Sequence, residues 1–149
     1  MKKAVIYLGA DHAGFSLKEK LKKYFDKRNI NYEDIGGDGK SNDDYPDYAF
    51  KVAKKVSKEK DSKGILICGT GTGMVIAANK VKGVRAAVAY DNYSAKMAVE
   101  HNNSNVLCLR GRNFPDDKNI RLVKIWLNAK FSSKSRHKRR LRKITNYEK

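Results

Sequence analysis

The stretch that decides the fold is Gly64-Ile-Leu-Ile-Cys-Gly-Thr-Gly-Thr-Gly-Met74. Its apolar residues 65–67 predict a buried strand that ends at Cys68. Glycine then stands at every second position, which lets backbone N–H groups turn towards a ligand and approach it closely. Residues 74–79 predict the start of a helix, whose dipole adds positive potential at the loop. A thiol in this setting is a candidate thiolate, so the stretch predicts a site for a small anionic substrate.

Two common glycine-rich motifs do not fit this loop. A dinucleotide fingerprint, G-x-G-x-x-G, would need a third glycine where Met74 stands. A phosphate-binding P-loop would end in G-K-[ST], which is absent from the stretch. A tight strand-to-helix turn beside a core cysteine stays open as the alternative at this point.

The composition indicates one globular domain over residues 1–149. The chain is 40% hydrophobic and has only two prolines, which argues against wholesale disorder. No apolar stretch of about 18 residues and no signal-peptide pattern is present, so we expect a soluble, cytoplasmic protein without membrane contact. Cys68 and Cys108 fit a reducing compartment better than a disulfide scaffold, and Cys108 is expected to be inert core.

The net charge of +17 is unevenly distributed. The last twenty residues hold nine Lys or Arg and one Glu, within an expected basic helix over about 132–149. The segment Arg136-His-Lys-Arg-Arg-Leu-Arg-Lys143 suits either nucleic acid or a phosphorylated small molecule, and composition leaves both open. Four other lysines, at positions 18, 20, 22 and 23, share a predicted helix with leucines and are expected to form a solvated face.

Predicted strands and helices alternate along the chain. Strands are expected over 4–9, 31–35, 65–68, 84–90 and 105–109, and helices over 15–28, from 44, from 74, over 91–101 and over 116–130, before the basic tail. This order predicts an α/β fold, in which a parallel sheet lies between helical layers.

Polar groups follow three of these strands. They are Asp11-His12, residues 68–73 and residues 110–113. Ligands of such sheets bind beyond the carboxyl ends of the strands, so we expect the three groups to converge there. Taken singly, each of these polar groups also fits a purely structural role, as a helix cap or a surface charge. His101 ends the helix before the last strand, and its placement depends on the fold.

Six motifs in order resemble the B-type ribose-5-phosphate isomerases, a family that also contains galactose-6-phosphate and allose-6-phosphate isomerases. The motifs are Gly9-Ala-Asp-His-Ala-Gly-Phe15, Asp44-Tyr-Pro-Asp-Tyr-Ala49, Ile67-Cys-Gly-Thr-Gly-Thr-Gly-Met74, Ala77-Ala-Asn-Lys80, His101-Asn-Asn-Ser-Asn-Val-Leu107 and Arg136-His-Lys-Arg-Arg140. The resemblance implies a three-layer, Rossmann-like α/β/α sandwich with strand order 2-1-3-5-4. It also implies a homodimer that shares its active sites, with a dimer of dimers left open. The implied reaction is an aldose–ketose isomerisation through an enediolate, without metal or nucleotide cofactor.

The resemblance also assigns roles to residues. Cys68 matches the base that moves a proton between C2 and C1, and Gly69, Gly71, Thr72 and Gly73 belong to the loop whose amides hold the enediolate oxygen. Asp11, Thr70 and His101 match groups that open the sugar ring, with His101 as the acid. His12, Arg112, Arg136 and Arg140 match phosphate ligands, and Tyr45 and Asn102 match further substrate contacts. Some family members instead carry a glutamate base after the third glycine; Met74 stands there, which favours Cys68.

The expected function is therefore the interconversion of ribose 5-phosphate and ribulose 5-phosphate in the pentose phosphate pathway. A six-carbon sugar phosphate is the alternative that the sequence leaves open, because pocket depth decides it. A nucleic-acid-binding role for the tail is more remote, since no recognised nucleic-acid module is present. A metal site from Asp11, His12 and His101 lacks a supporting ligand pattern. A dimer is expected because one subunit would not bring its own tail over its own Cys68, and Leu141 and Ile144 would then pack on the partner.

Overall fold

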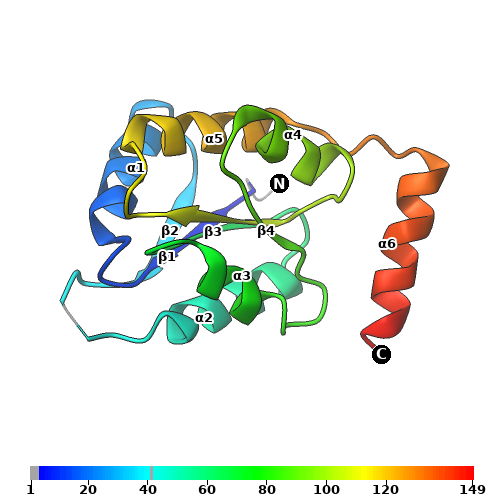
Figure 1. The fold of residues 1–149 in the computed structure, drawn as a ribbon, viewed down its shortest axis with the longest axis horizontal. Coiled ribbons are helices and arrows are strands. Elements are labelled where there is room, and N and C mark those ends of the chain that lie inside the picture. Colours follow the sequence, from blue (N-terminus) through cyan, green and yellow to red (C-terminus); the bar gives the residue numbers. More distant parts are fainter. Residues whose placement is uncertain (1–3, 41) are drawn as a thin grey trace.

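Five parallel strands form the middle layer of the computed structural model, which describes residues 4–40 and 42–149 (Figure 1). The strands are β1 (Ile6–Ala10), β2 (Tyr32–Gly36), β3 (Lys63–Cys68), β4 (Ala86–Val88) and β5 (Val106–Arg110). Their order is β2-β1-β3-β5-β4, which confirms the predicted order and fold class. Strand β2 lies on one side of β1, whereas β3, β5 and β4 lie on the other side. A topological switch point therefore lies between β1 and β3.

Helices cover both faces of the sheet. They are α1 (Phe15–Lys27), α2 (Tyr45–Lys58), α3 (Thr72–Ala78), α4 (Asn92–Glu100), α5 (Asp116–Asn128) and α6 (Ser135–Tyr147). Figure 1 shows α1, α4 and α5 on one face and α2 and α3 on the other. The predicted boundaries of most elements agree within two residues, and the helix expected from Met74 begins at Thr72.

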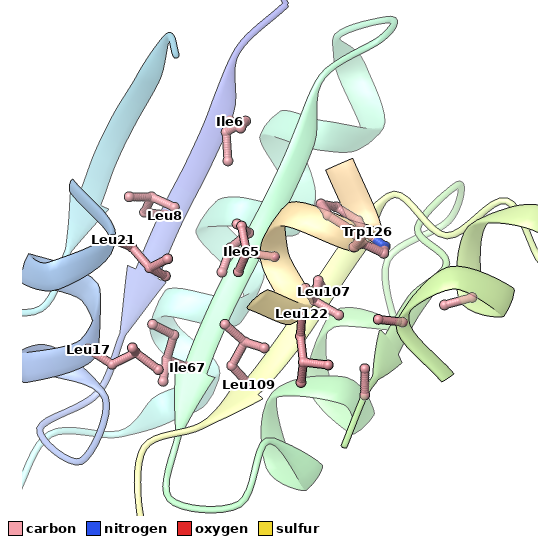
Figure 2. Close-up of a cluster of buried hydrophobic side chains, with 14 of the residues drawn as sticks. Ile6, Leu8, Leu17, Leu21, Ile65, Ile67, Leu107, Leu109, Leu122 and Trp126 are labelled. Carbon is pink, nitrogen blue, oxygen red and sulfur yellow. The ribbon is translucent and has the colours of Figure 1, made fainter. Parts of the chain in front are cut away.

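Strand β3 contributes side chains to both hydrophobic clusters, one on each face of the sheet. Ile65 and Ile67 point into the cluster below α1, α4 and α5, whereas Leu66 and Cys68 point into the cluster at α2 and α3. Figure 2 shows the first cluster, in which leucines of α1 and α5 and Trp126 lie against the central strands. Burial of each such aliphatic side chain stabilises the fold by about 1.5–3 kcal/mol. The unbroken apolar run of the sequence thus reflects a strand that is covered on both faces.

The fourth strand is shorter than predicted. The sequence predicts a strand over 84–90, but β4 covers only Ala86–Val88. Strand β4 lies at the edge of the sheet. On its outer side, the Asn79 side chain makes the hydrogen bonds that a neighbouring strand would make. Its Oδ1 accepts from the Ala86 N–H at 2.8 Å, and its Nδ2 donates to the Ala86 carbonyl at 3.0 Å. After β4 the chain turns at once into α4, where Asp91 and Ser94 form a capping box.

Lys18 does not belong to the solvated face that the sequence indicated. Its side chain is 1% exposed, and Nζ donates to Asp34 Oδ1 at 2.8 Å and to the carbonyls of Gly36 and Gly37 at 2.9 and 2.8 Å. Three acceptors compensate the loss of water around the ammonium group, which is why burial is tolerated. Lys20, two residues further along α1, is exposed as predicted.

The basic helix α6 stands apart from the layered body (Figure 1). His137 is the buried residue of this helix, at 4% exposed, while Ile144 is 52% exposed. A groove of about 720 Å³ lies between α6 and the edge of the sheet, with Val84, Leu141, Ile144 and Tyr147 in its walls. Much of the apolar face of α6 is therefore uncovered within one chain.

Candidate active site

Cys68 is the last residue of β3, between the ends of two neighbouring strands. Its carbonyl accepts from the Gly111 N–H at 2.8 Å after β5, and the Ile67 carbonyl accepts from the Asp11 N–H at 3.2 Å after β1. The sulfur accepts from the Gly71 N–H at 3.2 Å, and Cys68 is 4% exposed. The amide thus points a hydrogen-bond donor at the sulfur.

Two glycines of this loop are required, Gly71 by its backbone conformation and Gly73 by a close contact. Gly71 has φ of +83°, and a Cβ there would lie 3.1 Å from Val88 Cγ2. A Cβ at Gly73 would lie 2.6 Å from the Tyr45 ring, and one at Gly69 would lie 3.4 Å from Arg112 Nη1. The loop therefore has Tyr45 against one end and the Arg112 guanidinium against the other. Thr70 and Thr72 are exposed, and Thr70 Oγ1 accepts from the Thr72 N–H at 3.2 Å.

Asp11 and His12 follow β1 at the same edge. The Asp11 carboxylate accepts from the N–H groups of Ala13 and Gly14 at 3.0 and 3.2 Å. Burial raises the pKa of the Asp11 carboxyl above its ordinary value, although these two hydrogen bonds and the neighbouring His12 oppose the rise. A carboxyl group with a raised pKa at a sheet edge is suited to proton transfer.

The three polar groups that the sequence placed after strands do converge. A Cβ at Gly111 would lie 2.2 Å from the Ala13 carbonyl oxygen, so the segments after β1 and β5 touch. The Arg112 N–H donates to the Gly69 carbonyl at 3.2 Å, which joins the segments after β3 and β5. The predicted convergence at the carboxyl edge is therefore confirmed.

Arg110 supports the loop that carries Arg112. Its guanidinium donates to the carbonyls of Arg112 and Asn113 at 3.4 and 3.3 Å and lies 5.7 and 5.3 Å from the ring centres of Tyr90 and Phe114. The Tyr90 and Phe114 rings position the guanidinium by cation–π contact, and the guanidinium fixes the loop backbone by hydrogen bonds.

A second group of candidate residues lies at the opposite edge of the sheet. Helix α4 begins at the carboxyl edge and returns, so His101 and Asn102 lie near the strand starts. Asn105 confirms this, because its carbonyl accepts from the Gly64 N–H at 2.9 Å near the start of β3. Gly64 and Cys68 are about 13 Å apart along a strand. Within one chain, His101 and Asn102 therefore do not meet Cys68.

His137 joins the tail to this second group. Its ring lies 4.5 Å from the His101 ring, centre to centre, and its Nδ1 lies 2.5 Å from Ser132 Oγ. Burial lowers the pKa of His137, and the nearby charges of His101, Arg136 and Arg140 lower it further. Arg136 and Arg140 are exposed on α6, the helix that His137 links to His101. His137 belongs to the last of the six sequence motifs, but the resemblance implies no role for it.

Asp43 is a functional candidate that sequence reasoning missed. Its Oδ1 lies 2.6 Å from His12 Nδ1 and accepts from the His12 N–H at 2.9 Å, while Oδ2 accepts from Tyr48 at 3.1 Å. Burial acts to raise the pKa of Asp43, but the hydrogen bonds from His12 and Tyr48 outweigh it, so this pKa lies below its ordinary value. No motif links Asp43 to a histidine 31 residues earlier in the chain.

Within residues 4–40 and 42–149, no cluster of three His, Cys, Asp or Glu side chains is arranged to hold a metal ion. In the same part of the chain, none of the helices has the length and apolar character that a membrane span requires.

Comparison with known proteins places this chain among sugar-phosphate isomerases. The family profile described as Ribose/Galactose Isomerase matches residues 6–144. The probable ribose-5-phosphate isomerase B of Mycoplasma genitalium is 47% identical over 146 residues, which cover 97% of this chain and 95% of that protein. The D-erythrulose-4-phosphate isomerase 2 of Mycolicibacterium smegmatis is 41% identical over 146 residues, 96% of each chain. The crystal structure of ribose-5-phosphate isomerase B from Mycoplasma genitalium with bound ribulose-5-phosphate superposes with a TM-score of 0.94, at 45% identity, over 99% of this chain and 98% of that chain.

Proposed function

Because the chain belongs to the ribose/galactose isomerase family, we propose that it interconverts ribose 5-phosphate and ribulose 5-phosphate. The observation that carries this proposal is the Cys68 sulfur at the end of β3, 3.2 Å from an amide of the glycine loop. The ribulose-5-phosphate bound to the Mycoplasma genitalium enzyme supports the choice of a five-carbon ketose phosphate. This substrate assignment leads us to propose a cytoplasmic role in the pentose phosphate pathway for the single domain of residues 1–149.

The residues suggest how protons move in this reaction. The Cys68 thiolate takes the proton from C2 of the open-chain aldose, the C1–C2 double bond forms, and negative charge develops on the C1 oxygen. Amides of residues 69–73 stabilise this charge, and they do so more in the transition state than in the ground state. The thiol then returns its proton to C1 while the C2 hydroxyl passes its proton to the C1 oxygen, which gives the ketose. Asp11 and Thr70 act earlier, when the sugar ring opens.

We further propose that the enzyme is a homodimer in which each active site is built from both chains. Cys68 and His101 lie at opposite edges of one sheet, so one chain does not bring them together. A second copy would supply His101 and Asn102 for the sugar, and Arg136 and Arg140 for the phosphate, beside His12 and Arg112 of the first copy. The uncovered face of α6, with Leu141 and Ile144, supports this arrangement. Bidentate arginines at the phosphate would hold C1 and C2 at the thiol.

The substrate length needs its own test. One relative that is 41% identical is named D-erythrulose-4-phosphate isomerase 2, which makes a four-carbon phosphate the second candidate. The six-carbon aldose phosphates of galactose and allose are the third, because the sequence leaves them open.

An aldose–ketose assay on the purified protein tests both points. We expect kcat/KM to be highest for ribose 5-phosphate among the phosphates of erythrose, ribose, allose and galactose. A higher kcat/KM for a sugar phosphate of another chain length would change the assigned substrate but not the assigned reaction. No turnover of any of the four would overturn the proposed function.

A further inference from the structure

The Asp43 carboxylate makes an unusually complete set of contacts with His12. One oxygen, Oδ1, meets both the backbone N–H of His12 at 2.9 Å and its ring Nδ1 at 2.6 Å. The other oxygen accepts from the Tyr48 hydroxyl at 3.1 Å. Asp43 therefore fixes the main chain and the ring of His12 at the same time, with Tyr48 of α2 behind it.

The protonation of Asp43 decides which atom of the imidazole carries hydrogen. Because the pKa of Asp43 lies below its ordinary value, the group is a carboxylate at neutral pH and can only accept hydrogen bonds. The contact of 2.6 Å therefore requires the hydrogen on His12 Nδ1. The remaining nitrogen, Nε2, is left to meet a ligand. A carboxylate that orients a histidine in this way is a recurrent device at sites where one ring nitrogen must face a substrate or a metal.

Described residues on both sides of Asp43 have close contacts with the rest of the chain. Lys18 fixes the start of the loop before α2 through the carbonyls of Gly36 and Gly37. A Cβ at Gly37 would lie 2.1 Å from the Ala10 carbonyl oxygen, and one at Gly39 would lie 2.7 Å from the Phe15 ring. The loop is therefore packed against the segment that follows β1. On the other side of Asp43, the Tyr48 hydroxyl of α2 donates to its Oδ2 at 3.1 Å.

We propose that Asp43 is a positioning residue for phosphate recognition: it holds Nδ1–H of His12 and turns Nε2 towards the substrate phosphate. Because phosphate oxygens accept hydrogen bonds, the ring that binds them carries a second hydrogen on Nε2, and Asp43 offsets the positive charge of that form. This inference rests on the proposed function, because the phosphate is the group for which His12 is a candidate ligand there. Asp43 itself does not touch the substrate. Its neighbour Asp44 has no such role, since it is exposed and makes no side-chain capping bond at the start of α2.

Asp43→Asn is the variant that tests this role. The amide keeps the shape of the carboxylate but is neutral and has one acceptor oxygen. If that oxygen faces His12, the NH2 group can donate to the Tyr48 hydroxyl, and both His12 bonds lose their charge assistance. Charge-assisted hydrogen bonds are roughly twice as strong as neutral ones, so we expect KM for ribose 5-phosphate and the inhibition constant of inorganic phosphate to rise roughly five- to tenfold. The kcat should change less than about twofold, because the thiol and its loop are untouched. Asp44→Asn removes the same charge one residue away and should leave both constants unchanged.

Two further variants separate positioning from a merely structural role. Tyr48→Phe removes only the bond to Oδ2, and we expect KM to rise about twofold, in proportion to the smaller loss. In a His12→Ala background, Asp43→Asn should add nothing to the rise in KM, because Asp43 acts through the ring that is gone. An equal rise in both backgrounds, or an unchanged KM for Asp43→Asn in the wild-type background, would overturn the proposal.

Nitrogen NMR of the His12 ring gives a readout that does not depend on turnover. In the wild-type protein we expect hydrogen on Nδ1 throughout, and hydrogen on Nε2 as well when inorganic phosphate is added. In Asp43→Asn, part of the population should carry the hydrogen on Nε2 instead. If the wild-type protein isomerises no sugar phosphate but still shows these NMR signatures, the proposed function fails and the role of Asp43 survives. If the wild-type ring shows hydrogen on Nε2 alone, the role of Asp43 fails whatever the activity.

Discussion

The two edges of the sheet differ in how complete they are. At the carboxyl edge, the segments after β1, β3 and β5 touch one another, and Cys68, Asp11 and His12 each have defined partners within one chain. At the opposite edge, His101 stacks on His137, and beyond it α6 presents an open apolar groove. One chain thus carries a finished half of a site and an unfinished half. In the dimer proposed above, each site would combine the finished edge of one chain, with Cys68, His12 and Arg112, and the unfinished edge of the other, with His101.

The largest expected effect comes from the base at the finished edge. Cys68→Ala should lower kcat by roughly 10²- to 10⁴-fold, because a positioned proton acceptor is lost. The matched control is Cys108→Ala on β5. Burial raises the pKa of Cys108, and the nearby Cys68 raises it further, so this thiol stays neutral and serves packing. The control should lose stability and keep its kcat, as steady-state assays at several temperatures would reveal. Similar losses of kcat in both variants would remove the distinction between the two cysteines.

Complementation tests whether the two edges meet across subunits. Cys68→Ala and His101→Asn should each be nearly inactive, but when they are co-expressed in equal amounts, about a quarter of the wild-type activity should return, because random pairing restores one intact site in each mixed dimer. Cys68→Ala paired with Asp11→Asn is the control, since both changes lie at the same edge of one chain. Recovery in the control, or none in the test pair, would show that the site is not divided in this way.

Lys18→Met tests what holds the finished edge together. The change leaves the carbonyls of Gly36 and Gly37 without their donor, so we expect a loss of about 2–3 kcal/mol in the free energy of unfolding. Lys20→Met is the surface comparison, because Lys20 is exposed and pairs with Asp116; it should change little. Urea denaturation followed by circular dichroism measures both. Equal stability of the two variants would mean that the buried ammonium contributes nothing.

The smallest effect concerns the unfinished edge and its pH dependence. The pKa of His137 is lowered from its ordinary value of 6.5, so the folded state disfavours the protonated ring relative to the unfolded state. The stability that the neutral ring contributes is present above about pH 6.5 and is lost as the pH falls through the lowered pKa. Hydrogen exchange of α6 amides should therefore speed up on acidification below pH 6.5. His137→Asn should weaken this dependence, and an unchanged dependence in that variant would assign it to another group.

Much of the finished edge was predictable from the sequence. Asp11, Cys68 and Arg112 each come directly after, or within two residues of, a strand end, and parallel strands bring their carboxyl ends together. The placement of His101 was not predictable by the same rule, because a residue that ends a helix lies at whichever edge the helix returns to. Only the observed strand order and register settle that.

Other features escaped sequence reasoning because they depend on contacts between distant segments. The lysine pattern of α1 is that of a solvated helix, and nothing in it marks Lys18 as the residue that the end of β2 covers. Asp43 lies among turn-forming polar residues, where a carboxylate is unremarkable until its distance to His12 is known. The length of β4 was overestimated because its flanking residues are apolar or β-forming, whereas the Asn79 side chain and the α4 cap end the strand early.

The bonds between Asn79 and Ala86 also affect how the protein behaves in a crowded cell. An exposed edge strand offers unpaired backbone groups, on which another extended chain can dock and start an aggregate. Here one side-chain amide occupies both the N–H and the C=O of Ala86 at the start of the edge strand. Because β4 has only three residues, few other backbone groups remain with which another chain could pair. A single asparagine thereby closes the backbone groups of Ala86 to pairing with a further strand.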